Sequence, residues 1–187
     1  VPSGRIEGLT AAMAAAERGH VEAIGLLVEK RANLEVEDWN GWTALMYAVN
    51  GQRPDCVRAL LDAKASANVA AGDEQRTPLM LAAGRGRPEL CSILLAAGAL
   101  REARDKEGRK ALHFAAKMGN GGAIMALLGA RARLDEADCG GLTPLLQASA
   151  AGRAEAVKTL LAHGADASKR DLEGRTAAQI AGIQGHE

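Results

Sequence analysis

The chain has 187 residues, of which 48% are hydrophobic, so it is long and apolar enough to bury a core. Its 23 Lys and Arg residues balance 23 Asp and Glu residues, and the charges alternate without long runs, which argues against a nucleic-acid-binding stripe. Gly, Glu or Arg interrupts every apolar stretch well before the roughly 18 to 20 residues of a membrane span, so we expect no membrane insertion.

Along the chain, one block of residues occurs six times. It reads Gly-x-Thr-(Pro/Ala)-x-x-x-Ala-Ala, followed by Gly-His or its equivalent and then by a Leu-Leu pair. The separations between successive anchor residues are 33, 34, 33, 33 and 33, and these anchors are Thr10, Thr43, Thr77, Lys110, Thr143 and Thr176. Such regular spacing indicates a repeat architecture.

The chemistry of one block predicts its local structure. Thr before Pro starts a helix, as at Thr77 and Thr143, because the hydroxyl accepts a free amide and Pro suits the first turn. A glycine about nine residues later can end that helix in the left-handed conformation, at Gly19, Gly86, Gly119, Gly152 and Gly185. A second amphipathic helix and an Asp-x-x-Gly turn follow. Each unit is therefore helix, turn, helix and hairpin, and the units must stack to bury their apolar faces.

These motifs resemble the ankyrin-repeat family from about residue 5 to residue 187. The resemblance implies an all-α solenoid, with a single domain spanning residues 1–187. It contains about six repeats, of which the last is incomplete, near residues 5–37, 38–71, 72–104, 105–137, 138–170 and 171–187. It further implies that the hairpin tips and first helices line a concave surface where protein partners bind.

Several positions depart from the repeat. Lys110 replaces the capping Thr, which predicts a softer fourth copy unless another group substitutes for the hydroxyl. Gln52 replaces a helix-ending Gly beside Gly51, and the glycine after the second helix is replaced three times, by Arg31, Lys64 and Arg131. One extra residue lies between Asn68 and Thr77, so the loop 69–76 should be longer than the others.

Both ends look unfinished. The chain opens at Val1 with neither Met nor an apolar signal core, which indicates a processed form or a fragment. The first copy lacks a polar outer face, and the sixth reaches Glu187 without a second helix, leaving Ile180 and Ile183 with little expected cover. We therefore expect further repeats or partner subunits to flank the chain.

The histidines and cysteines fit structural roles better than chemical ones. By the family resemblance, the four histidines, His20, His113, His163 and His186, take structural positions. Cys56 and Cys91 fall in second helices and should pack in the core, whereas Cys139 lies on a hairpin. The odd cysteine count favours a reducing intracellular compartment, first the cytoplasm and then the nucleus or an organelle. We expect no catalytic residue, no metal and no cofactor.

The candidate partner-binding residues are those that the repeat does not require. Trp39, Trp42 and Tyr47 fall within nine residues, and exposed aromatics of this kind are typical binding anchors. Further along the expected concave surface come Arg76, Arg85, Lys106, Arg109, Phe114, Lys117 and Met118, with Asp73, Glu74 and Glu107 interspersed. This pattern suits a protein segment with apolar and acidic residues. Packing of one Trp on a neighbouring hairpin and solvation of the loop charges are the alternatives.

The sequence thus favours a non-catalytic adaptor or scaffold. Two alternatives remain open: a regulatory or targeting segment of a larger enzyme or channel, and a structural subunit fixed in a large complex. The fold alone does not choose between them.

Overall fold

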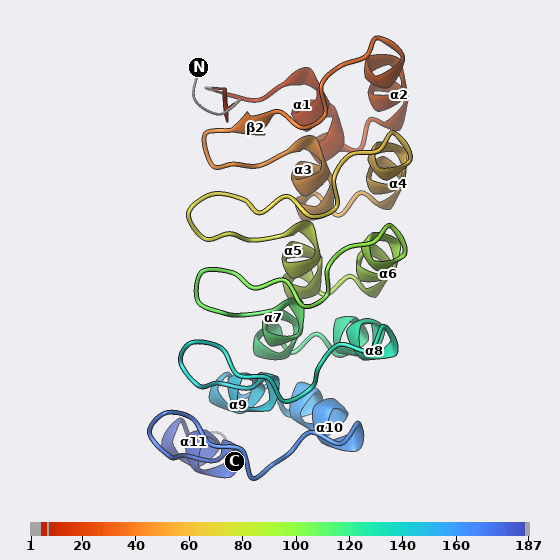
Figure 1. The fold of residues 1–187 in the computed structure, drawn as a ribbon. Coiled ribbons are helices and arrows are strands. Elements are labelled where there is room, and N and C mark those ends of the chain that lie inside the picture. Colours follow the sequence, from red (N-terminus) through yellow and green to blue (C-terminus); the bar gives the residue numbers. More distant parts are fainter. Residues whose placement is uncertain (1–4, 7, 186–187) are drawn as a thin grey trace.

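The computed structural model describes residues 5–6 and 8–185, and in that part of the chain eleven helices stack in two columns (Figure 1). The first column consists of α1 (Ala11–Arg18), α3 (Ala44–Asn50), α5 (Pro78–Arg85), α7 (Ala111–Met118), α9 (Pro144–Ala150) and α11 (Ala177–Ile183). The second consists of α2 (Val21–Glu29), α4 (Pro54–Asp62), α6 (Pro88–Ala96), α8 (Gly121–Gly129) and α10 (Ala154–Ala162). The predicted all-α solenoid is confirmed.

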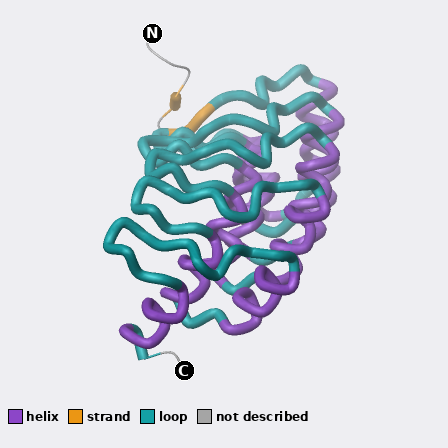
Figure 2. The backbone as a smooth tube through the Cα atoms, turned by 60° about the horizontal axis from the view of Figure 1, so that its bottom comes forward, coloured by secondary structure: helices purple, strands orange, loops and turns teal. Residues whose placement is uncertain are grey.

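Extended hairpins leave the first column on the side away from the second helices (Figure 1). Figure 2 shows the loops gathered along one side of the stack and the helices along the other. The strands β1 (Arg5–Ile6) and β2 (Glu37–Asp38) pair in parallel beside the first two repeats. In the described segment, no helix combines the length and apolarity that crossing a bilayer requires.

Five of the six first helices begin after a threonine, and in three of them its hydroxyl caps the helix as predicted. The hydroxyls of Thr10, Thr77 and Thr143 each accept the backbone N–H three residues on, at 3.1, 3.4 and 3.3 Å. The Thr43 hydroxyl is buried without a hydrogen-bond partner among the described residues. The threonine hydroxyl therefore stabilises the helix start at three anchors but not at Thr43.

Lys110 replaces the hydroxyl cap with an ion-pair network. Its ammonium group lies between Glu102 and Glu136, 2.6 Å from the Glu136 carboxylate, and its side chain is only 5% exposed. Its backbone N–H donates to His113 Nδ1 at 3.1 Å. The His113 N–H, which a threonine hydroxyl would accept, donates to the Lys110 carbonyl oxygen at 2.9 Å. The ion pairs and this bond hold the helix start without the hydroxyl, which argues against the predicted softening of the fourth copy.

The residues that replace the glycine after the second helices keep its left-handed conformation. Arg31, Lys64 and Arg131 have φ values of 58°, 68° and 63°. These conformations are costly for residues with a side chain, by roughly 1 to 2 kcal/mol each. The array keeps the turn geometry of the repeat although the glycine is missing.

Gln52, and not the adjacent Gly51, takes the left-handed conformation at the end of α3. Its φ is 58°, whereas that of Gly51 is −72°. A Cβ atom on Gly51 would lie 2.5 Å from the carbonyl oxygen of Glu17 in the preceding repeat. The glycine is therefore needed for close packing between repeats and not for the helix end.

The hairpins are closed by a repeated aspartate. Asp38, Asp105, Asp138 and Asp171 each accept backbone N–H groups two and four residues on, and each pairs through its main chain with the residue four positions later. The third hairpin has no such aspartate. Its main chain pairs Ala71 with Arg76, five residues later, where the other hairpins pair residues four apart. The predicted extra length of this hairpin is confirmed and lies at its tip.

The last repeat differs in part from the sequence-based expectation. Ile180 is buried, so the prediction that it has little cover is wrong: it lies on the face of α11 that packs against α9. Ile183 is 66% exposed, as predicted. On α10, Val157 is only half-buried and Leu161 is exposed, and both line a groove of about 410 Å³ beside α11.

Candidate functional site

Two rows of side chains form the surface between the hairpins and the first helices. One row precedes the anchor in each repeat and contains Trp42, Arg76, Arg109 and Leu142. The other lies four residues after the anchor and contains Tyr47, Leu81, Phe114 and Gln147. Ring contacts join the rows: Trp42 meets Tyr47, and the guanidinium carbons of Arg76 and Arg109 lie 5.5 and 4.9 Å from the Phe114 ring centre. Because the units are stacked, neighbouring repeats present these residues as a continuous surface.

Trp39, Trp42 and Tyr47 form the aromatic end of this surface. Trp39 is 73% exposed on its hairpin, as a binding anchor would be. Trp42 is half-buried instead, because its ring packs edge-on against Tyr47 with 5.4 Å between ring centres. Trp39 and Trp42 line an open cavity of about 500 Å³ with Asp73, Glu74 and Arg76 of the next hairpin.

Tyr47 is fixed by the hairpin aspartate. Its phenol donates to Asp38 Oδ2 at 2.8 Å. In the fifth repeat, Gln147 Nε2 donates to Asp138 Oδ2 in the same way, at 2.9 Å. The aspartate that closes the hairpin thus also orients the side chain on the following helix, which makes the position of Tyr47 rigid.

Ionisation of Tyr47 is a direct test of this contact, since it is the chain's single tyrosine. Burial, then the hydrogen bond to Asp38 and the charges of Asp38 and Glu17, raise the pKa of Tyr47 to about 12. We expect an absorbance titration near 295 nm to show a midpoint well above the ordinary value of about 10. Trp39→Ala, outside the contact, should leave the midpoint unchanged; an ordinary midpoint in the native chain would contradict the contact.

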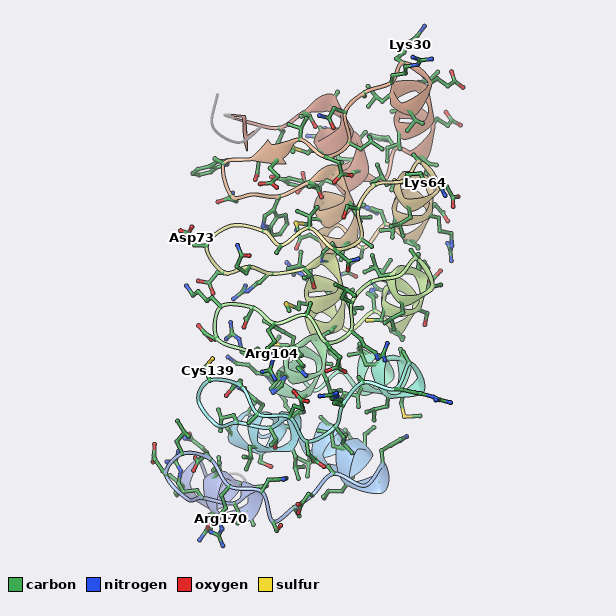
Figure 3. The ribbon with its side chains drawn as sticks, viewed as in Figure 1. Lys30, Lys64, Asp73, Arg104, Cys139 and Arg170 are labelled. Carbon is green, nitrogen blue, oxygen red and sulfur yellow. The ribbon has the colours of Figure 1, made fainter. Side chains whose placement is uncertain are left out.

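The predicted basic residues mostly gather around one cavity between α5 and α7. Its volume is about 310 Å³, and its lining includes six predicted residues, Arg76, Arg85, Arg109, Phe114, Lys117 and Met118. Lys106 does not line this cavity; it lies in the tip segment of the fourth hairpin, where its ammonium group pairs with Glu74. Asp73 and Cys139 mark the tips of the third and fifth hairpins in Figure 3, on the side away from Lys30 and Lys64.

Carboxylates within the chain neutralise part of this basic cluster. Arg109 is held by Asp105 at 2.8 Å and by Glu107 at 2.5 Å. Arg85 donates to the neutral amide of Asn50. The positive charge open to a partner therefore comes from fewer residues than the sequence suggested.

His113 has a structural role, as predicted. It is buried, its Nδ1 accepts from the Lys110 backbone and its Nε2 lies 3.1 Å from the Leu142 carbonyl oxygen. This network assigns the proton to Nε2, and burial lowers the pKa of His113, so the ring stays neutral. His20 and His163 are exposed, and His186 lies outside the described residues.

Two of the three cysteines are buried and offer no activated thiol. Cys56 and Cys91 are buried in α4 and α6, and burial raises the pKa of both thiols, that of Cys91 to about 12. Cys139 is exposed on its hairpin, as expected. In the part of the chain that the structure describes, no group of three or more His, Cys, Asp or Glu side chains is arranged to hold a metal ion.

Sequence reasoning missed Met80, Leu81 and Gln147, which also line the cavity between α5 and α7. Leu81 and Gln147 occupy the same repeat position as Tyr47 and Phe114, four residues after the anchor. Aligning the repeats by that position would have found both. No single copy shows the signal, because a leucine or a glutamine on a helix is unremarkable by itself.

Comparison with known proteins gives a consistent result. A family model described as ankyrin repeats, in three copies, matches residues 2–71, 64–138 and 120–187. The chain is 35% identical over 91 residues to human ankyrin repeat and KH domain-containing protein 1. The matched segment covers 48% of this chain and 4% of the human protein.

Two other relatives show the same partial coverage. A putative E3 ubiquitin-protein ligase, XBAT31, of Arabidopsis thaliana is 36% identical over 103 residues, covering 49% of this chain and 23% of the relative. The Schizosaccharomyces pombe glycerophosphocholine phosphodiesterase gde1 is 51% identical over 59 residues, covering 30% of this chain and 5% of that protein. The chain thus spans less than a quarter of each of these three relatives.

Proposed function

The chain belongs to the ankyrin-repeat family, a class of protein-binding modules, and from this premise we propose that it is a non-catalytic scaffold for a protein partner. The partner would lie along the surface from Trp39 and Trp42 to the cavity between α5 and α7. The observation that carries this proposal is the 73% exposure of Trp39 beside that surface. Neither the helix ends nor the core needs an indole there, and exposed tryptophan is enriched among residues that dominate binding.

The surface has the physical properties that a protein segment requires. Apolar area from Trp39, Trp42 and Phe114 supplies hydrophobic contact, and the guanidinium groups of Arg76 and Arg109 stack on Phe114. The side chains are held by the first helices and by closed hairpins, so little order has to be created on binding. We propose an intracellular, reducing setting and no nucleic-acid partner, in line with the free cysteines and the balanced charge.

One alternative is that this scaffold serves as a segment of a larger protein. The small share of each relative that the chain covers, 4%, 5% and 23% in the three cases, favours it. A fixed structural subunit is the other alternative, and the apolar groove at Val157 and Leu161 favours that. Under that alternative the groove, and not Trp39, would carry the main contact.

The test is partner capture with the native chain and the Trp39→Ala/Trp42→Ala variant as baits, followed by mass spectrometry and affinity measurement with the purified partner. We expect Trp39→Ala alone to change the free energy of unfolding by less than about 0.5 kcal/mol and to weaken binding about tenfold or more. Trp42→Ala should also destabilise the hairpin, because that ring packs on Tyr47.

Leu172→Ala is the matched control, since Leu172 is a 78% exposed apolar residue on the sixth hairpin. It should leave both stability and affinity unchanged. A partner retained at full affinity by the double tryptophan variant would contradict the proposed surface. Loss of the same partner on Leu161→Arg would then favour the structural-subunit alternative.

A further inference from the structure

Two arginines that precede a helix anchor are held from within their own hairpins. In the fourth repeat, Asp105 Oδ2 accepts from Arg109 Nε and lies 2.8 Å from its terminal nitrogen. In the sixth, Asp171 Oδ2 accepts from Arg175 Nε at 2.8 Å and lies 2.7 Å from its terminal nitrogen. The carboxylate of the hairpin aspartate, four residues before the arginine, thus pairs with the guanidinium group and also accepts the backbone N–H groups.

Arg76 occupies the same repeat position without that partner. The main-chain pairing of the third hairpin places Ala71 where Asp105 and Asp171 stand in the others. Arg76 Nε is buried and has no hydrogen-bond acceptor among the described residues. Its nearest carboxylate is Glu74, at 3.7 Å from a terminal nitrogen, and Lys106 is bound to that same carboxylate. The guanidinium group of Arg76 is therefore left without the carboxylate oxygen that holds Arg109 and Arg175.

The rest of the Arg76 side chain faces the candidate site. The side chain is 41% exposed although Nε is buried, so its exposure belongs to other atoms. Arg76 lines both the cavity beside Trp39 and Trp42 and the cavity between α5 and α7. It therefore stands at the junction of the aromatic end and the basic end of the surface.

The cavity between α5 and α7 is complementary to an anion with an apolar neighbour. Its lining includes four basic side chains, Arg76, Arg85, Arg109 and Lys117, and no carboxylate, although Arg109 is already paired with carboxylates outside the cavity. Met80, Leu81 and Phe114 supply apolar area in the same cavity. Arg85 and Lys117 also lie in the last turns of α5 and α7, where helix dipoles favour cations. The helix dipole does not explain Arg76, which lies before a helix.

We propose that Arg76 is the receptor for a carboxylate of the partner, and that the partner is an acidic protein segment with an apolar side chain beside its Asp or Glu. This inference rests on the proposed function and specifies its ligand. The incoming carboxylate supplies the negative charge that Asp105 and Asp171 supply to Arg109 and Arg175, but without their contact to Nε, which is buried in Arg76. It pairs with the terminal nitrogens of Arg76, and the apolar neighbour packs against Phe114 and Leu81.

The first experiment selects ligands without assuming a natural partner. A phage-displayed library of random linear peptides is bound to the immobilised chain, and a selected peptide is synthesised with a fluorescent label. An amide twin carries Asn for each Asp and Gln for each Glu. We expect the selected peptides to be enriched in acidic residues next to aromatic or aliphatic ones. We also expect the acidic peptide to bind at least about tenfold more tightly than its twin in fluorescence anisotropy.

Two variants then test Arg76 itself. Arg76→Gln should weaken binding of the acidic peptide about tenfold or more and leave the amide twin almost unaffected. Ala71→Asp restores the carboxylate of the other hairpins, so we expect the new aspartate to pair with Arg76 and to raise or preserve the melting temperature. It should also weaken binding of the acidic peptide. Arg175→Gln is the matched control, since its arginine is already paired, and it should not change peptide affinity.

The outcomes separate this inference from the proposed function. Selected peptides without acidic residues that still depend on Trp39 would overturn the carboxylate assignment and leave the scaffold function standing. Equal binding of the acidic peptide to the native chain, Arg76→Gln and Ala71→Asp would overturn it as well. A library that yields no binder sensitive to Trp39 or Arg76 would count against both proposals.

Discussion

Lys110→Ala is expected to lower the free energy of unfolding by about 2 to 3 kcal/mol, somewhat less than breaking a fully buried ion pair costs. The Lys110 side chain is 5% exposed, and its ammonium group lies between Glu102 and Glu136, whose side chains are 32% and 25% exposed. Its removal leaves two carboxylates near each other with less positive charge. Partial exposure lets water screen them, so the loss stays below the range for a fully buried pair. Denaturant unfolding followed by circular dichroism measures it.

Lys158→Ala is the control for this change. Lys158 is 73% exposed and pairs with Glu155 at 2.8 Å on the surface of α10. Exposed pairs of this kind contribute at most about 1 kcal/mol. Equal destabilisation by the two lysine variants would contradict the buried network at Lys110.

Acid unfolding checks the same network from the carboxylate side. Hydrogen bonds from Lys110 and then Arg133 lower the pKa of Glu136 to about 2. A carboxylate whose pKa is lowered in the folded state stabilises the fold at pH values above its unfolded pKa, which is about 4.3 for Glu. That contribution is lost as the pH falls toward 2. We expect stability to fall less steeply in this window for Lys110→Ala than for the native chain. Identical slopes would show that Lys110 does not hold the Glu136 charge.

Gly41→Ala is expected to destabilise the chain by about 3 kcal/mol or more, because strain and a backbone clash add together. Gly41 has φ +76°, and a Cβ atom there would lie 2.5 Å from the backbone nitrogen of Gly72 in the next hairpin. The second and third hairpins would have to separate. Since Trp39 and Arg76 lie on these two hairpins, partner binding should weaken together with stability.

Gly174→Ala separates the two contributions. Gly174 ends the equivalent turn of the sixth hairpin with φ +75°, but a Cβ atom there would meet nothing within 4 Å. We expect only the left-handed penalty, roughly 1 to 2 kcal/mol, and no change in partner affinity. Similar losses for both variants in thermal unfolding would mean that the contact between the hairpins adds nothing.

Much of the candidate site could be placed from the sequence, because the repeat assigns each residue to a position in the unit. In this way the sequence placed Trp39 on a hairpin and Tyr47 and Phe114 on first helices, which is where the structure has them. Their surroundings could not be placed. Trp42 is half-buried because it contacts Tyr47. Lys106 is neutralised by Glu74, which lies 32 residues earlier in the chain.

The sequence by itself determined the helix, turn, helix and hairpin unit, its six copies and their stacking, because caps, glycines and apolar spacing are local signals that every copy repeats. Only the tertiary structure decided which charges and rings remain open to a partner. Lys110 could be seen to lack a hydroxyl, but not to lie beside Glu136; Arg76 could be seen to be basic, but not to lack the acceptor that Arg109 has. The reason is physical. Lys110 meets Glu136 and Lys106 meets Glu74 across neighbouring repeats, 26 and 32 residues apart in the chain, and no local pattern records such a contact. Where the acceptor lies in the same hairpin, as Asp105 does for Arg109, only the fold decides whether the two side chains meet.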